Sequence, residues 1–157
     1  MQKIMPCLWF DDQAEQAAEF YTSIFKHSKV DKISYYGEDG RGEKGKVMTV
    51  TFQLNGEDFM ALNGGPEYKF TPAISLFVNC ENQAEVDDLW ERLSLGGEKG
   101  PCGWLTDQFG VSWQIVPTIL GVLLSDKDEK KAKSVMQAML QMGKLEIAKL
   151  QQAYEQA

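Results

Sequence analysis

Histidine is almost absent from this chain of 157 residues, in which His27 is the single representative. Catalytic metal sites commonly use two or three imidazole ligands, and this sequence cannot supply two. The residues around His27 are polar, in the order Lys-His-Ser-Lys, so we expect its ring to lie in solvent. This scarcity excludes the metal centres that depend on a pair of histidines.

Cysteine, basic charge and long apolar runs are also scarce. Three cysteines form an odd set without a Cys-x-x-Cys pair, which favours reduced thiols in a cytoplasmic protein. Asp and Glu outnumber Lys and Arg by 23 to 16, and the net charge of −7 disfavours nucleic acid or an anionic membrane as a partner. No apolar run approaches the roughly 18 residues that span a bilayer, and no signal peptide is recognisable.

Two amphipathic helices about 70 residues apart indicate an internal repeat. They are predicted over Gln13–Phe25 and Gln83–Leu95, each with apolar residues at positions i, i+3, i+4 and i+7 and each beginning with Gln-Ala-Glu. The pairs Asp11-Asp12 and Glu81-Asn82 have the composition of helix caps. Short strands are expected before the helices, over Ile4–Phe10 and Ala73–Asn79. The alternative is two unrelated amphipathic helices.

Alternating side chains predict the strands that follow the first helix. They are expected over Val30–Tyr36, Lys46–Leu54 and Phe59–Leu62, with a tight hairpin turn at Asn55-Gly56. The second helix is followed by a weak edge strand and then by a hairpin over Cys102–Pro117.

In the hairpin over Cys102–Pro117, the side chains of the second strand alternate between two faces of different polarity. Gly110 supplies the positive φ of the turn, and Pro117 ends the second strand. One face of that strand is apolar and suits a helix-covered core, whereas the other is more polar and suits a wet or ligand-filled concavity. The apolar face comprises Val111, Trp113 and Ile115, and the other comprises Ser112, Gln114 and Val116.

These elements predict an α+β fold with two βαβββ modules, at about residues 1–65 and 72–118. A connector rich in glycine and proline, Asn63–Pro72, separates them. Residues 119–157 are predicted to form a helical extension, with helices over Asp128–Met142 and Lys144–Tyr154. We expect the apolar stripes of these helices to pack on the sheet or on a partner subunit.

Several short motifs are similar to those of a known family. They are Pro6, Leu8-Trp9-Phe10, Ala14-Glu15, Phe20-Tyr21, Phe59–Pro66, Phe70–Ala73 and, most specifically, Gly103–Pro117. Two βαβββ modules that each offer one sheet face to a shared cup resemble the vicinal oxygen chelate superfamily of glyoxalases, dioxygenases and antibiotic resistance proteins. Within it the chain resembles the PhnB-like family, also labelled a 3-demethylubiquinone-9 3-methyltransferase domain, over about residues 1–145. The resemblance implies a cup-shaped mixed sheet and a homodimer.

Enzymes of that superfamily hold a divalent metal on one face of the cup. The resemblance places the four ligand positions at Met5, Ala61, Ala73 and Gln114. None of these residues is a good ligand for a hard or borderline divalent ion, so we expect no metal. We expect no other cofactor either, because no glycine-rich turn opens a helix as a Rossmann-type S-adenosylmethionine site would require.

The cup face is predicted to hold an aromatic, half-polar site for a small molecule. Alternation along the strands assigns nine ligand-binding residues to this face: Cys7, Trp9, Thr49, Thr51, Phe59, Ser75, Phe77, Ser112 and Gln114. A tenth, Trp104, is expected at the rim. No catalytic residue is assigned. Cys7 has no base beside it and suits a small packed residue better than a nucleophile, and Asp107 suits a turn.

The sequence thus predicts a metal-independent small-molecule-binding protein. One alternative is an enzyme of the same superfamily, of the lyase, isomerase or dioxygenase type, that holds a metal with atypical ligands or uses Gln114 for acid–base work. Another is a non-catalytic oligomerisation module, in which the cup faces are filled by their own side chains. A bound ligand or a sizeable cavity near Gln114 would exclude the oligomerisation module.

Overall fold

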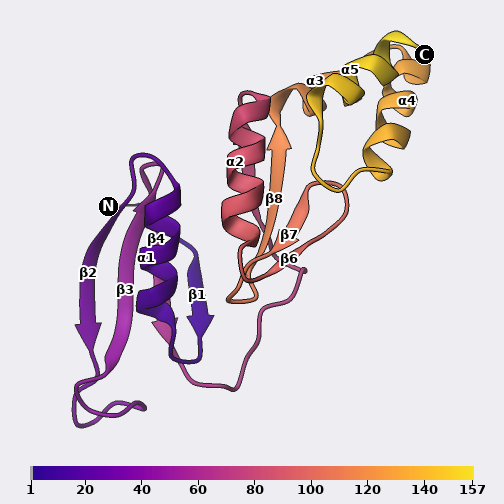
Figure 1. The fold of residues 1–157 in the computed structure, drawn as a ribbon. Coiled ribbons are helices and arrows are strands. Elements are labelled where there is room, and N and C mark those ends of the chain that lie inside the picture. Colours follow the sequence, from indigo (N-terminus) through magenta and orange to yellow (C-terminus); the bar gives the residue numbers. More distant parts are fainter. Residues whose placement is uncertain (1) are drawn as a thin grey trace. The chain divides into compact units, whose positions relative to one another are not determined.

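The computed structural model describes residues 2–157 and divides the chain into two compact units, which meet in sequence between Phe70 and Thr71 (Figure 1). This boundary lies inside the connector predicted at Asn63–Pro72. Within residues 2–157, none of the helices combines the length and the apolar character needed to cross a membrane.

The N-terminal unit contains one helix and one four-stranded mixed sheet. Its elements are β1 (Cys7–Phe10), α1 (Ala14–Ile24), β2 (Lys29–Tyr35), β3 (Val47–Leu54) and β4 (Glu57–Asn63). The strand order is β1-β4-β3-β2, with β1 parallel to β4 and the other pairs antiparallel. Helix α1 packs on β3 and β4, and its Tyr21 contacts Phe52 with ring centroids 6.2 Å apart. Both side chains are fully buried, so the core of this unit lies between α1 and one face of the sheet.

The C-terminal unit repeats this topology. It consists of β5 (Leu76–Cys80), α2 (Gln83–Ser94), β6 (Glu98–Lys99), β7 (Trp104–Thr106) and β8 (Ser112–Pro117). The strand order is β5-β8-β7-β6, and β5 is parallel to β8. The predicted α+β fold with two βαβββ modules is therefore confirmed. The shared cup stays a prediction.

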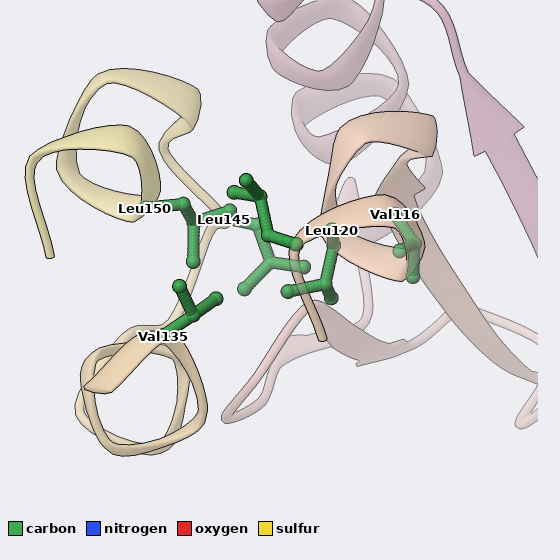
Figure 2. Packing of buried hydrophobic residues seen from close by; sticks show 6 residues of the cluster. Val116, Leu120, Val135, Leu145 and Leu150 are labelled. Atoms are coloured by element: carbon green, nitrogen blue, oxygen red, sulfur yellow. The ribbon is translucent and has the colours of Figure 1, made fainter. Parts of the chain in front are cut away.

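Three further helices belong to the C-terminal unit: α3 (Thr118–Leu124), α4 (Glu129–Leu140) and α5 (Ile147–Glu155). They pack around a buried cluster that includes Val135, Leu145 and Leu150, each fully buried (Figure 2). Val116 of β8 is part of the same cluster. This end of the more polar face of β8 is therefore covered by the C-terminal helices, and the prediction of a wet face there is wrong for Val116.

The two repeated helices begin differently. The predicted cap of α2 is confirmed, because the side chain of Asn82 accepts a hydrogen bond from the Glu85 N–H at 2.9 Å. The predicted cap at Asp11-Asp12 is wrong, because α1 starts after Gln13 without a side-chain cap. Its first amide, from Ala14, instead donates to Oδ1 of Asn63 in β4 at 2.8 Å. A tertiary contact thus replaces the local cap.

Candidate functional site

Helix α1 covers one face of the N-terminal sheet and leaves the other face open within its own unit. Strand pairing places Cys7, Trp9, Thr49 and Thr51 together on the open face, as predicted. Cys7 is exposed and the other three are half-buried. These four positions can therefore offer an indole, a thiol and two hydroxyl groups to a ligand.

Phe59 lies on the opposite face, so its prediction as an open-face residue is wrong. It pairs with Phe52, and the two rings stack with centroids 5.5 Å apart. Ala61 pairs with the fully buried Val50 on the same helix-covered side, so its expected place on the cup face is also wrong. The run Phe-Met-Ala-Leu is apolar at every position, so it has no alternation of polar and apolar side chains from which the two faces could be assigned. A slip of one residue then exchanges the two faces.

The open face also carries residues that the sequence analysis missed. Met60 pairs with both Cys7 and Thr51, and Leu62 pairs with both Trp9 and Thr49. On β2, the hydroxyl of Ser34 is hydrogen-bonded to that of Thr49. The two-residue turn at Asn55-Gly56 is the sequence signal that would have shown which residues of β4 lie on the open face. It sets Leu54 opposite Glu57 and thereby the pairing of every later residue.

Trp9 is held in place by the connector that follows β4. Its indole N–H donates to the carbonyl oxygen of Gly65 at 2.9 Å, and Tyr68 meets its ring edge-on with centroids 4.9 Å apart. Gly64 lies so close to the indole that any Cβ there would collide with it. The ring is thus a fixed wall of the open face.

On the C-terminal sheet, Gln114 lies between two aromatic residues. It pairs with Phe77 on one side and with Trp104 on the other, and its Nε2 donates to Oγ of Ser75 at 3.0 Å. Phe77 is 53% exposed, whereas Gln114 and Trp104 are half-buried. Ser112 shares this face but is only 3% exposed and offers little surface. The structure therefore brings four of the five predicted residues of this unit together around an accessible amide.

The buried carboxylate of Asp107 organises the hairpin that carries Gln114. Its Oδ1 accepts hydrogen bonds from the N–H groups of Phe109 and Val111 at 2.8 and 3.0 Å, and its Oδ2 accepts one from the Trp113 indole at 2.9 Å. Gly110 takes a φ of 93° in the turn. The prediction of Asp107 as a turn residue is confirmed. Because Trp113 points into the core on one side of β8, Gln114 must point to the other.

The thiols of Cys7 and Cys80 have environments that raise the pKa and oppose ionisation. Partial burial raises the pKa of the Cys7 thiol. Burial, together with the negative charge of Glu85, raises the pKa of Cys80 to about 12. A thiol is a good nucleophile only as the thiolate, so neither environment activates its cysteine at neutral pH.

The positions that the superfamily uses for a metal do not fit one in this chain. Ala61 is buried on the helix-covered side, and its open-face neighbours Met60 and Leu62 have no hard donor atom. Gln114 could offer only the neutral amide oxygen Oε1, which is a weak ligand for a divalent ion. Among residues 2–157, no group of three or more His, Cys, Asp and Glu side chains could hold a metal ion. The prediction that the protein works without a metal stays a prediction.

Two surface concavities are lined by other residues. One, of about 600 Å³ in the N-terminal unit, lies beside the start of α1 and the end of β4 and includes Asp11, Arg41 and Asn63. The other, of about 510 Å³ in the C-terminal unit, lies between the start of α2 and α5 and includes Asp87 and Lys144. None of the ten predicted ligand-binding residues lines either concavity.

Residues 2–116 match the model of a protein family described as 3-demethylubiquinone-9 3-methyltransferase. The chain belongs to this family. The match ends at the last strand, so the resemblance that was expected to reach about residue 145 is not confirmed for the C-terminal helices. A comparison with curated proteins found no match.

One solved structure supports the same assignment, and two more distant ones share the fold. A PhnB protein from Bacillus cereus, which carries the same methyltransferase description, is 40% identical and superposes with a TM-score of 0.67, covering 74% of this chain and 100% of its own. Protein PA1353 from Pseudomonas aeruginosa is 21% identical, with a TM-score of 0.63 and coverage of 74% and 98%. The fosfomycin resistance protein FosX from Listeria monocytogenes, solved with Mn(II) and sulfate, is 17% identical, with a TM-score of 0.50 and coverage of 72% and 88%. The fold is thus that of the vicinal oxygen chelate superfamily.

The family description names a methyltransferase, and the helix starts of this chain can be compared with those of a Rossmann-type one. In a Rossmann-type methyltransferase the cofactor binds where a glycine-rich turn opens a helix after a parallel strand. Here α1 is preceded by Gln13 and α2 by Asn82, and each sheet contains one parallel pair of strands. These features do not fit that kind of S-adenosylmethionine site.

Proposed function

We propose that this family member is a metal-independent binding protein for a neutral aromatic small molecule, which it holds on its open sheet faces. The observation that carries the proposal is the position of Gln114 between Phe77 and Trp104. Ring surfaces supply contact area, and a single oriented amide supplies direction, as is typical of small-molecule sites. The hydrogen bond from Nε2 to Ser75 orients this amide. In the proposal, Oε1 accepts a hydrogen bond from the ligand.

The polar groups at the centre of this face favour a ligand without charge. Gln114 and Ser75 are neutral, and no full charge is paired directly beside Gln114 in the strand register. A charged ligand would lose hydration there without gaining an opposite charge, which is costly. In the N-terminal unit, Trp9 and the hydroxyls of Thr49 and Thr51 offer the same combination of an aromatic wall and neutral polar groups.

Benzamide tests this proposal because it combines a flat ring with a neutral amide that can donate to Oε1. Benzoate and benzylamine serve as anionic and cationic controls of the same shape. We expect benzamide to bind the EDTA-treated full chain more tightly than either control, as measured by ligand-observed NMR. We expect Gln114→Ala to weaken benzamide binding about threefold to tenfold, the value of one neutral hydrogen bond. Gln108→Ala, in the exposed turn of the same hairpin, is the matched control.

Three results would contradict the proposal. The first is benzamide binding that Gln114→Ala leaves unchanged. The second is equal binding of the charged controls. The third is stoichiometric metal in the purified protein, together with stabilisation by added manganese, zinc, nickel or iron(II), which would favour the metal-dependent alternative.

Thr51→Val tests whether the sheet face of the N-terminal unit contributes to benzamide binding. Light scattering tests the predicted homodimer, and a dimer without benzamide binding would favour the oligomerisation module.

A further inference from the structure

The segment Met142–Ile147, which joins α4 to α5, is bonded to the start of the hairpin that carries Gln114. We call this segment the strap. The N–H of Cys102 donates to the carbonyl oxygen of Met142 at 2.7 Å, and the N–H of Gly103 donates to that of Gly143 at 2.8 Å. Both donor residues have left-handed φ values, of 57° and 83°. The turn Cys102-Gly103 is therefore held in an uncommon conformation, with both of its amides on the strap.

The same turn is bonded to β8 on its other side. The carbonyl oxygen of Gly103 accepts a hydrogen bond from the N–H of Ile115 at 2.8 Å. A Cβ on Gly103 would lie 2.9 Å from the carbonyl oxygen of Ile115 and 3.0 Å from Cδ1 of Leu145 in the strap. Trp104 is the next residue of the chain and pairs with Gln114. A shift of the strap would therefore be transmitted through the turn to Trp104.

One side chain of α2 holds the other end of the strap. Nε2 of Gln83 donates to the carbonyl oxygen of Leu145 at 3.0 Å, and its Oε1 accepts from the N–H of Ile147 at 2.7 Å. Leu145 is fully buried in the cluster of Figure 2, which anchors the strap between these bonds. Lys144 and Asp87 form an ion pair at 2.9 Å beside it, but surface pairs of this kind contribute little.

We propose that Gln83 is a positioning residue for the ligand face: through the strap it fixes the turn Cys102-Gly103 and thereby the place of Trp104 beside Gln114. The consequence for binding rests on the proposed function. A face that is held in its binding geometry loses less freedom when a ligand arrives, so it binds more tightly than a loose one. In this proposal the C-terminal helices, which lie outside the family match of residues 2–116, increase the affinity of the site because the strap between them holds Trp104 in place.

Fluorine NMR of the full chain labelled with 5-fluorotryptophan tests the inference, because the chain has four tryptophans whose signals can be assigned by single Trp→Phe variants. Gln83→Ala should shift or broaden the Trp104 signal, leave the Trp9 signal unchanged and speed hydrogen exchange of the Ile115 amide. It should also weaken benzamide binding about threefold to tenfold. Gln13→Ala is the matched control, since Gln13 begins the repeat-equivalent Gln-Ala-Glu and is exposed. If Gln83→Ala does not fold, Gln83→Glu keeps the acceptor for Ile147, loses the donor to Leu145 and to the Asp87 carboxylate, and is compared with Gln83→Glu/Asp87→Asn to remove the repulsion between the two carboxylates.

The outcomes separate this inference from the proposed function. An unchanged Trp104 signal with unchanged Ile115 exchange overturns the inference, whatever benzamide does. A changed Trp104 signal with weaker benzamide binding supports it. A changed signal with unchanged benzamide binding overturns it if Gln114→Ala still weakens benzamide binding. If Gln114→Ala has no effect either, the proposed function has failed, and the Trp104 signal alone supports the positioning role of Gln83.

Discussion

Replacement of the buried Asp107 carboxylate by an amide should destabilise the C-terminal unit while leaving its backbone in place. Asp107 is 3% exposed and Trp113 is 2% exposed, so water cannot replace the hydrogen bond between them easily. In Asp107→Asn, the amide oxygen can still accept from the backbone N–H groups that Oδ1 now serves. The amide NH₂ then faces the Trp113 indole N–H, and two donors meet.

The magnitude follows from the number of bonds affected. A hydrogen bond to a charged group contributes about 1.5–3 kcal/mol, and a buried donor without an acceptor costs about 1–3 kcal/mol. Asp107→Asn loses one bond and weakens two, so we expect it to cost about 2–3 kcal/mol. Asp107→Ala loses all three, and we expect a cost of about 4 kcal/mol or more, at the upper end for single substitutions.

Urea denaturation followed by tryptophan fluorescence and far-ultraviolet circular dichroism measures these costs, with agreement of the two probes as the test for a single transition. A double-mutant cycle with Trp113→Phe isolates the carboxylate–indole bond. We expect a coupling energy of about 1.5 kcal/mol or more between the two positions. Additive costs, or an Asp107→Asn cost below about 0.5 kcal/mol, would refute the reasoning and leave the backbone turn alone as the organiser of the hairpin.

Two other predictions follow from the titration of side chains. The N–H of Asp128 and the Tyr154 hydroxyl lower the pKa of Asp126, so its contribution to stability is present above the ordinary aspartate pKa of about 3.9 and is lost as pH falls toward the lowered value. Tyr154→Phe should therefore reduce the loss of thermal midpoint between neutral and acid pH, and an unchanged acid profile would contradict this. For the thiols, Cys80 should resist iodoacetamide at pH 8 in the native protein, and Cys7 should react more slowly than a free thiol such as glutathione. Mass spectrometry of the alkylated peptides measures both rates, and rapid native labelling of Cys80 would be the contrary result.

Local sequence signals were sufficient to predict a cap or a turn where the hydrogen-bond partner of the residue lies nearby in the chain. Asn82 lies three residues before the amide that it caps, and Asp107 lies two and four residues before its backbone donors. Gly110 takes the positive φ that its turn requires. These interactions depend on short-range geometry, and a single stretch of sequence contains all of it.

The candidate site was only partly predictable for the same reason. Four of the five predicted residues of the C-terminal face lie around Gln114, because Trp113 and Gln114 alternate in a strand of mixed polarity, whereas Ser112 and Val116 are buried. Phe59 was placed on the wrong face because β4 is apolar on both sides. Its side is decided by the pairing of β4 with β3, which depends on the register set at the Asn55-Gly56 turn.

By itself, the sequence determined the repeated βαβββ order, the scarcity of histidine and the membership of the family, because these depend on residue types and their spacing. Only the tertiary structure decided that Asn63 would receive the first amide of α1, that Val116 would be covered by the C-terminal helices and that Gln83 would hold the strap. Each of these contacts joins residues far apart in the chain. The polar or apolar character of each residue shows that it needs a partner when buried. Only the packed fold decides which partner it contacts.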